Sequence, residues 1–216
     1  MGSGLAQKMA QEGLSVVLVD VTSELVKRGF DRIGETLREA VEREILRPQQ
    51  VDDIRERIQG TTELADTRDC DLVIEAVFEE MDVKKDLFAR LEKVASPKTI
   101  FASNTSSFSV GELARATDRA DRFVGLHFFY HPAKNRLLEI MPGSATSRET
   151  LVACKRFSEL IGKTDIVVKD SPGFAVNRFF VPWLNEATRM LEEGLADIPT
   201  IEEAAMRSLA IGMGPF

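Results

Sequence analysis

Short runs of aliphatic and β-branched residues alternate with longer amphipathic stretches along the first half of the chain. The runs predict strands and the stretches predict helices: strands at 15–19, 71–77 and 99–103, helices at 4–12, 23–46 and 83–94. Strands that alternate with helices are typical of βα units around a parallel sheet. The pattern therefore predicts an α/β fold whose sheet is covered on both faces.

The order of elements changes in the second half of the chain. Two strand-like runs, at 122–129 and 136–141, are joined by a short connection that contains Pro132. This spacing predicts a hairpin-like pair. A helix at 148–161 and a strand at 165–168 follow.

After Ser171-Pro172-Gly173 the pattern becomes almost wholly helical, at 174–193 and 201–209. A Pro-Gly turn at such a change of pattern is typical of a domain boundary. We therefore predict two domains, an α/β domain over residues 1–170 and the start of a helical domain over residues 171–216.

Composition and charge narrow the class of protein. Of the 216 residues, 44% are hydrophobic and 29% are charged, as in ordinary globular domains. The net charge of −7 works against nucleic-acid binding. The apolar runs fall short of the ~18 residues that a membrane-spanning helix needs. Two cysteines, Cys70 and Cys154, are too few for a disulfide framework. We expect reduced cysteines, a cytoplasmic location, and neither nucleic acid nor a membrane as partner.

The first residues have the pattern of a glycine-rich phosphate loop. Gly2 and Gly4 lead directly into the first predicted helix, and the strand after this helix ends at Asp20. In dinucleotide-binding units, glycines let a pyrophosphate approach the helix N-terminus, and a carboxylate at the tip of the second strand binds the adenosine ribose. Asp20 therefore favours NAD over NADP. Taken alone, two glycines are equally typical of a flexible start before an ordinary helix. The full loop follows a strand and begins with further glycines, so we expect those residues to precede Met1.

Polar residues at 103–107 follow a predicted strand, where ligands of open α/β folds bind. The hydroxyl groups of this segment, including that of Ser106, can therefore contact a ligand. The alternative is a polar loop in which Ser107 or Ser109 caps the next helix.

A histidine and a glutamate lie on the two strands of the predicted pair. His127 is near the end of the first, and Glu139 follows twelve residues later on the second. If these strands pair, the carboxylate can hydrogen-bond His127, fix its tautomer and stabilise the imidazolium that forms when it accepts a proton. The alternative is a structural histidine, with Glu139 paired to an arginine such as Arg136.

Two further polar residues have less specific surroundings. His131 lies four residues after His127, but Pro132 and the β-like surroundings argue against a helix, so we predict no metal site. Asn177 lies in the first turn of the helix after Gly173, where its amide can contact a ligand or cap the helix.

Together these segments resemble the L-3-hydroxyacyl-CoA dehydrogenases over essentially the whole chain. The matching segments are residues 1–7, 17–20, 75–79 (Glu-Ala-Val-Phe-Glu), 103–107 (Ser-Asn-Thr-Ser-Ser), 125–129 (Gly-Leu-His-Phe-Phe), 138–139, 172–178 and 213–216. The resemblance implies that His127 is the base that removes the hydroxyl proton and that Glu139 orients it. It also implies that Ser106 and Asn177 hold the substrate oxygen.

The resemblance further implies a fold, ligands and an activity. A Rossmann-like NAD-binding domain and a helical domain would oxidise an L-3-hydroxyacyl-CoA to the 3-ketoacyl-CoA by hydride transfer to NAD. Glu79, Lys84, Asn104 and Ser106 would line the NAD site with Gly2, Gly4 and Asp20, and Thr36 and Arg43 would contact CoA. The full-length protein would be a homodimer.

This chain departs from the family pattern in three places. Tyr130-His131 stands where the family has Asn-Pro, so the contact made by that Asn is not carried over. We also expect the first strand to precede Met1 and further helices to follow Phe216. Two other functions fit these residues, a dehydrogenase of a 3-hydroxy acid without CoA and a non-catalytic remnant that binds partners.

Overall fold

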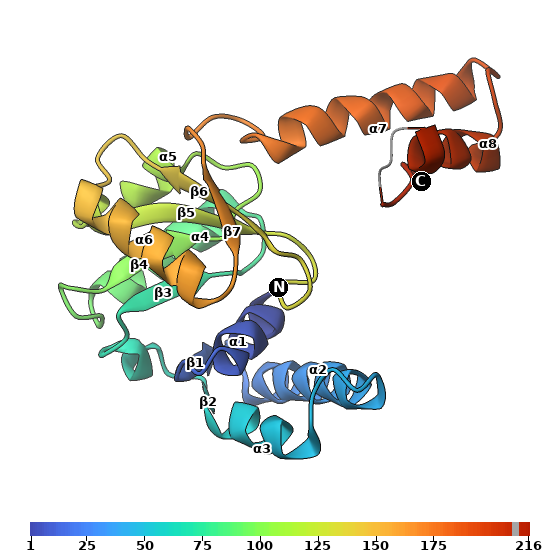
Figure 1. The fold of residues 1–216 in the computed structure, drawn as a ribbon. Helices are drawn as coiled ribbons and strands as arrows, with labels where there is room; N and C mark the ends of the chain where they lie inside the picture. The colour runs from blue at the N-terminus through green and yellow to red at the C-terminus, as the bar shows by residue number, and fades with distance from the viewer. Residues whose placement is uncertain (209–211) are drawn as a thin grey trace. The chain divides into compact units, whose positions relative to one another are not determined.

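The computed structural model describes residues 1–208 and 212–216 and divides into two compact units, Met1–Ser171 and Pro172–Phe216 (Figure 1). The first unit is an α/β domain and the second is helical. The division falls one residue after the boundary predicted at residue 170.

The strands of the first unit form two sheets within the described residues. Their bounds are β1 (Val16–Val19), β2 (Ile58–Thr61), β3 (Leu72–Glu75), β4 (Ile100–Ser103), β5 (Phe123–Phe128), β6 (Leu137–Pro142) and β7 (Thr164–Val167). β1 pairs with β2 in parallel, and the larger sheet has the order β3-β4-β5-β6-β7. Its neighbouring strands are parallel except for β5 and β6, which are antiparallel. The predicted α/β class with a mainly parallel sheet is confirmed.

Helices cover both faces of the larger sheet (Figure 1). The helical segments of the first unit are α1 (Gly2–Gln11), α2 (Ser23–Glu42), α3 (Pro48–Glu56), η1 (Leu64–Thr67), α4 (Met81–Glu92), α5 (Val110–Ala114), η2 (Ala120–Arg122) and α6 (Arg148–Leu160). Successive strand residues point to opposite faces. Val124 and Leu126 on β5 therefore share a core with Cys154 of α6, whereas Phe123 contacts Phe88 of α4. The face of β5 that carries Phe123 also carries His127.

Helix α1 packs between two hydrophobic cores. Leu5 and Met9 lie in the core of the larger sheet, while Ala6 and Ala10 lie in the core formed with α2, α3 and the small sheet. Residues four apart in a helix share a face, so these two pairs define adjacent stripes on α1. Because both stripes are buried, α1 connects the two sheets.

Helix α3 and strand β2 were not predicted, because their apolar signal is weak. Strand β2 has the sequence Ile-Gln-Gly-Thr, in which only Ile58 is buried. A Cβ atom on Gly60 would lie 2.5 Å from the Phe30 ring and 2.7 Å from Val26. The glycine is therefore needed where α2 packs against β2.

The second unit contains α7 (Val176–Glu192), α8 (Ile198–Glu203) and a π-helical turn η3 (Ala204–Ser208). α7 begins two residues later than predicted, because Gly173 and Phe174 have positive φ angles of 76° and 47°. The predicted helix at 201–209 ends at Leu209, outside the described residues. None of the helices in the described part of the chain has the length and apolar character needed to cross a membrane.

Candidate active site

The carboxyl ends of β3, β4 and β5 bring several polar residues together. In the parallel register Glu75 lies opposite Ser103, and Ser103 lies opposite Gly125. His127 is two residues further along β5, on the same face as Gly125. Ligands of open α/β sheets bind at this edge.

His127 has a carboxylate on one side and a hydroxyl group on the other. The antiparallel register places His127 directly opposite Glu139, and His127 Nδ1 lies 2.7 Å from Glu139 Oε2. Both side chains are buried, with exposed fractions of 6% and 0%. A carboxylate can only accept, so it holds the ring proton on Nδ1. The other nitrogen, Nε2, lies 3.2 Å from the Ser106 hydroxyl oxygen. The structure therefore brings together three of the four predicted catalytic residues.

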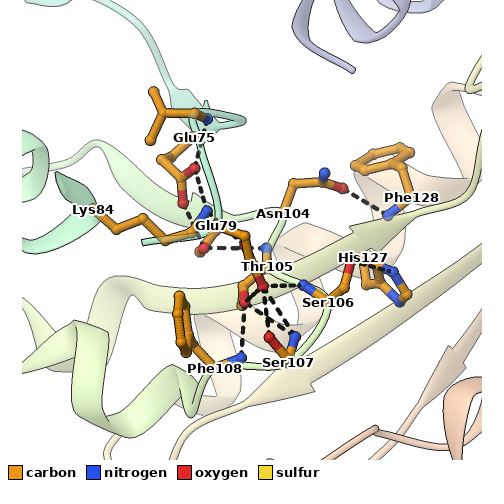
Figure 2. Close-up of polar contacts among 12 residues, drawn as sticks. Glu75, Glu79, Lys84, Asn104, Thr105, Ser106, Ser107, Phe108, His127 and Phe128 are labelled. Carbon is orange, nitrogen blue, oxygen red and sulfur yellow. Dashed lines mark hydrogen bonds and ion pairs between the residues drawn. The ribbon is translucent and has the colours of Figure 1, made fainter. Parts of the chain in front are cut away.

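The loop that carries Ser106 is organised by Glu79 (Figure 2). One carboxylate oxygen, Oε1, accepts hydrogen bonds from the Thr105 hydroxyl group at 2.5 Å, the Ser106 amide at 2.9 Å, the Ser107 amide at 3.1 Å and the Ser107 hydroxyl group at 3.0 Å. Burial alone would raise the pKa of Glu79. The hydrogen bonds from Thr105 and Ser106 and the charge of Lys84 outweigh burial and hold this pKa below its usual value.

Lys84 is buried inside the domain, although the family resemblance implies that it lines the NAD site. Its side chain is 1% exposed, and its ammonium group lies 2.7 Å from Glu75 and 3.1 Å from Glu79. Glu79, 39% exposed, lies nearer to the surface. A direct cofactor contact stays a prediction for both residues, whereas the structure shows Lys84 holding Glu79. Glu75 belongs to a segment quoted for the family resemblance, but sequence reasoning gave it no role.

Asn104 joins the ends of two strands. Its side-chain oxygen accepts a hydrogen bond of 2.8 Å from the Phe128 backbone amide, and the backbone amide of Asn104 donates to the Glu75 carbonyl oxygen. The side chain thus fixes the segment next to His127. Its predicted cofactor contact stays a prediction.

The predicted residues of the adenosine half of the NAD site lie on α1 and directly after β1. Asp20 follows β1 directly, is exposed, and accepts a hydrogen bond from the Val21 amide. Gly2 and Gly4 lie in the first turn of α1, which carries no acidic residue. A Cβ atom on Gly4 would lie 3.1 Å from Pro132 and 3.3 Å from the His131 ring. Glycine at position 4 therefore makes room for the 131–132 segment.

The remaining predicted ligand contacts are on helices. Thr36 lies on α2 and Arg43 is the C-cap residue of this helix, seven residues later, so the two share a face of the helix. Thr36 donates a hydrogen bond to the Arg32 carbonyl oxygen, and Arg43 is exposed. Asn177 is the second residue of α7 in the second unit. The CoA contacts and the role of Asn177 stay predictions.

Metal ligation and thiol chemistry have no structural support in the described residues. In this part of the chain, no three histidine, cysteine, aspartate or glutamate side chains lie together in a group that could hold a metal ion. His131 Nδ1 accepts a hydrogen bond from the Ala133 amide. Cys70 and Cys154 are free, and burial raises the pKa of the Cys154 thiol to about 12.

A sheet with helices on both faces, a carboxylate after β1 and a histidine–carboxylate pair at the carboxyl edge define a class of protein, the dinucleotide-dependent oxidoreductases. Comparison with known families identifies the family within this class. The model of the 3-hydroxyacyl-CoA dehydrogenase NAD-binding domain matches residues 1–171, and that of the C-terminal domain of the same enzymes matches residues 173–216. The chain belongs to the 3-hydroxyacyl-CoA dehydrogenase family.

Individual relatives agree with this assignment. The chain is 41% identical to the mitochondrial hydroxyacyl-coenzyme A dehydrogenase of Sus scrofa over all of its own length and 71% of that protein. It is 38% identical to a 3-hydroxybutyryl-CoA dehydrogenase of Bradyrhizobium diazoefficiens, again over its whole length and 74% of the relative. The crystal structure of (S)-3-hydroxybutyryl-CoA dehydrogenase from Ralstonia eutropha superposes with a TM-score of 0.95 at 39% identity, covering 100% of this chain and 76% of that one.

Proposed function

We propose that this protein interconverts L-3-hydroxyacyl-CoA and 3-ketoacyl-CoA thioesters with NAD as the hydride carrier. The observation that carries the proposal is the buried arrangement of Glu139, His127 and Ser106, with distances of 2.7 and 3.2 Å between successive side chains. A histidine whose Nδ1 is oriented by a carboxylate can accept a proton through Nε2.

In the oxidation, His127 Nε2 accepts the proton of the C3 hydroxyl group. The electron pair of that O–H bond forms the C3 carbonyl as the hydride leaves C3, and NAD, when bound, supplies the acceptor for this hydride. Glu139 stabilises the imidazolium, because its carboxylate is buried beside Nδ1. In the reduction, the same imidazolium returns the proton to the carbonyl oxygen.

Ser106 positions the substrate oxygen. Its hydroxyl group lies within hydrogen-bond distance of His127 Nε2, so an oxygen atom that contacts both groups is in place for proton transfer. The family resemblance also implies a substrate contact for Asn177, and this contact stays a prediction. Ser106 does not need to titrate for this role.

The residues present fit NAD as the cofactor. The first turn of α1 offers backbone amides without a competing acidic side chain, as a pyrophosphate site requires. The exposed Asp20 carboxylate follows β1, where it can accept hydrogen bonds from a ribose diol and repel a 2′-phosphate.

We further propose that the enzyme is a cytoplasmic homodimer. Exposed apolar side chains of the second unit, including Phe179, Val181 and Leu195, support a subunit interface. The two free cysteines suit a reducing compartment. Sedimentation at several protein concentrations tests the dimer, and fractionation of the source cells tests the location.

The activity test compares a thioester with its free acid. NADH oxidation is followed with acetoacetyl-CoA and with acetoacetate at equal concentrations. The proposal predicts turnover of the thioester and a much lower kcat/KM for the acid. Preference for the acid would identify a dehydrogenase of free 3-hydroxy acids, and no turnover of either by the folded protein would support a non-catalytic role.

A further inference from the structure

Glu75 is a buried carboxylate at the end of β3. Its side chain is fully buried and accepts a hydrogen bond from the Lys84 ammonium group at 2.7 Å (Figure 2). It also accepts hydrogen bonds from the Val77 amide at 2.8 Å and the Ser103 hydroxyl group at 2.6 Å. Each of these donors lies in a different segment. Glu75 therefore ties together the end of β3, the end of β4 and helix α4.

A carboxylate in this position needs its ionic partner. Moving a charge out of water is unfavourable, and only a well-placed opposite charge and further hydrogen bonds offset this cost. An apolar pair of the same size is often no less stable than a buried ion pair. The charges of Glu75 and Lys84 are therefore better explained by what they position than by stability.

The Lys84 ammonium group links Glu75 to the loop beside His127. It lies 3.1 Å from Glu79 Oε2, while Glu79 Oε1 binds the backbone and hydroxyl groups of residues 105–107. Lys84 thus fixes one carboxylate oxygen of Glu79 and the loop fixes the other. Ser106, which carries the hydroxyl group next to His127 Nε2, is in the middle of this loop.

We propose that Glu75 is a positioning residue of the dehydrogenase, which fixes Lys84 and Glu79 and so keeps the Ser106 hydroxyl group in register with His127. The proposal rests on the proposed function for its effect on catalysis. Its structural part, the order of the 105–107 loop, is independent of that function.

The change Glu75→Gln tests this role with an isosteric side chain. A glutamine removes the negative charge that faces the Lys84 ammonium group, and it places an NH2 group among groups that all donate to the wild-type carboxylate. Lys84 then keeps Glu79 as its charged partner and draws it away from the loop. We expect the Ser106 and Ser107 amides to exchange hydrogen at least about tenfold faster, because their acceptor is displaced. The kcat for acetoacetyl-CoA should fall by about 10²-fold with little change in KM, the cost of a misplacement of ~1 Å.

A charge-balanced variant separates positioning from stability. Glu75→Gln combined with Lys84→Met removes both buried charges, so the melting temperature should recover toward the wild-type value. The loop amides should still exchange fast and kcat should stay low. If Glu75→Gln alone does not fold, this double variant gives the same two readings.

A second ion pair of the same domain provides the matched control. Glu92 binds Arg119 at 2.8 and 2.9 Å, and Arg119 in turn holds backbone carbonyl groups before β4. Glu92→Gln should lower the melting temperature without changing kcat or the exchange of the Ser106 and Ser107 amides.

Two results would overturn the proposal: wild-type exchange rates of the Ser106 and Ser107 amides in Glu75→Gln, or recovery of both the melting temperature and kcat in the double variant. Failure of the proposed function looks different. In that case the wild-type protein does not turn over acetoacetyl-CoA, while the amide exchange of the variants still shows whether Glu75 orders the loop.

Discussion

Replacing Glu139 by Gln removes the negative charge beside His127 while keeping the size of the side chain. The Glu139 carboxylate and His127 Nδ1 are 2.7 Å apart, and both side chains are almost fully buried. When His127 accepts the substrate proton, the imidazolium ring and the carboxylate carry opposite charges, whose centres are about 4 Å apart. These charges attract each other by about 4 kcal/mol at an effective dielectric constant of ~20. At about 1.4 kcal/mol for each factor of ten, losing this attraction lowers kcat roughly a thousandfold.

The glutamine also changes the tautomer. Its NH2 group can donate to Nδ1, which places the ring proton on Nε2 next to Ser106. A histidine with that tautomer cannot accept the substrate proton, and the corresponding change in a serine-protease triad lowers kcat about 10⁴-fold. We therefore expect a fall of about 10³- to 10⁴-fold.

The assay for Glu139→Gln is the steady-state reduction of acetoacetyl-CoA by NADH, measured from pH 5 to 9. The control is Glu112→Gln, which removes the partly buried ion pair with Lys85 and should leave kcat unchanged. A Glu139→Gln variant with kcat within tenfold of the wild-type value would refute the reasoning, because the carboxylate would then contribute little to proton transfer.

Three further predictions concern the cofactor, the packing and the pH dependence. NADH should be preferred over NADPH, and Asp20→Ala should lower the ratio of kcat/KM for NADH to kcat/KM for NADPH at least about tenfold. Equal kcat/KM values for the two cofactors in the wild-type protein would contradict the role of Asp20. Gly60→Ala should lower the free energy of unfolding by about 1–3 kcal/mol, because its Cβ atom would lie 2.5 Å from the Phe30 ring. Urea denaturation measures this change, and an unaltered midpoint would show that Phe30 can move. The pKa of Glu79 is lowered in the folded protein, so its contribution to stability is present above the unfolded-state pKa of ~4.3 and is lost as the pH falls through the folded value. The free energy of unfolding should therefore fall with acidification below pH ~4.3, and Glu79→Gln should flatten that fall; an unchanged slope would contradict this linkage.

The strand pair that carries the base could be predicted from the sequence. Strands β5 and β6 are nearly continuous buried runs, and the short connection with Pro132 leaves little choice but antiparallel pairing. Spacing alone left open whether His127 would meet Glu139, with Arg136 as the alternative partner. The observed register places His127 and Glu139 directly opposite each other.

The organisation of the loop beside His127 could not be predicted. It depends on contacts between residues 75–84 and 103–107, which begin at the ends of the neighbouring strands β3 and β4 and are far apart in the sequence. The local sequence pattern places Lys84 on a helix, but it does not show which groups the side chain of Lys84 faces. For the same reason a lysine expected at the cofactor surface is buried between two carboxylates.

Elements with few buried apolar residues could not be predicted from the sequence pattern either. β2 has one buried apolar residue in four, and the helix before it is short and polar. Both are held by packing against α1 and α2, which is a tertiary effect.

The central claim is that His127 is the base of a thioester dehydrogenase, and the most direct test is kcat for acetoacetyl-CoA in His127→Gln compared with the wild-type protein. Binding of NADH, measured by fluorescence titration, serves as the control for folding and cofactor affinity. We predict that kcat falls by about 10²- to 10⁴-fold while the Kd for NADH changes little. Wild-type kcat in His127→Gln would contradict the account, because the proton would then be transferred by another group.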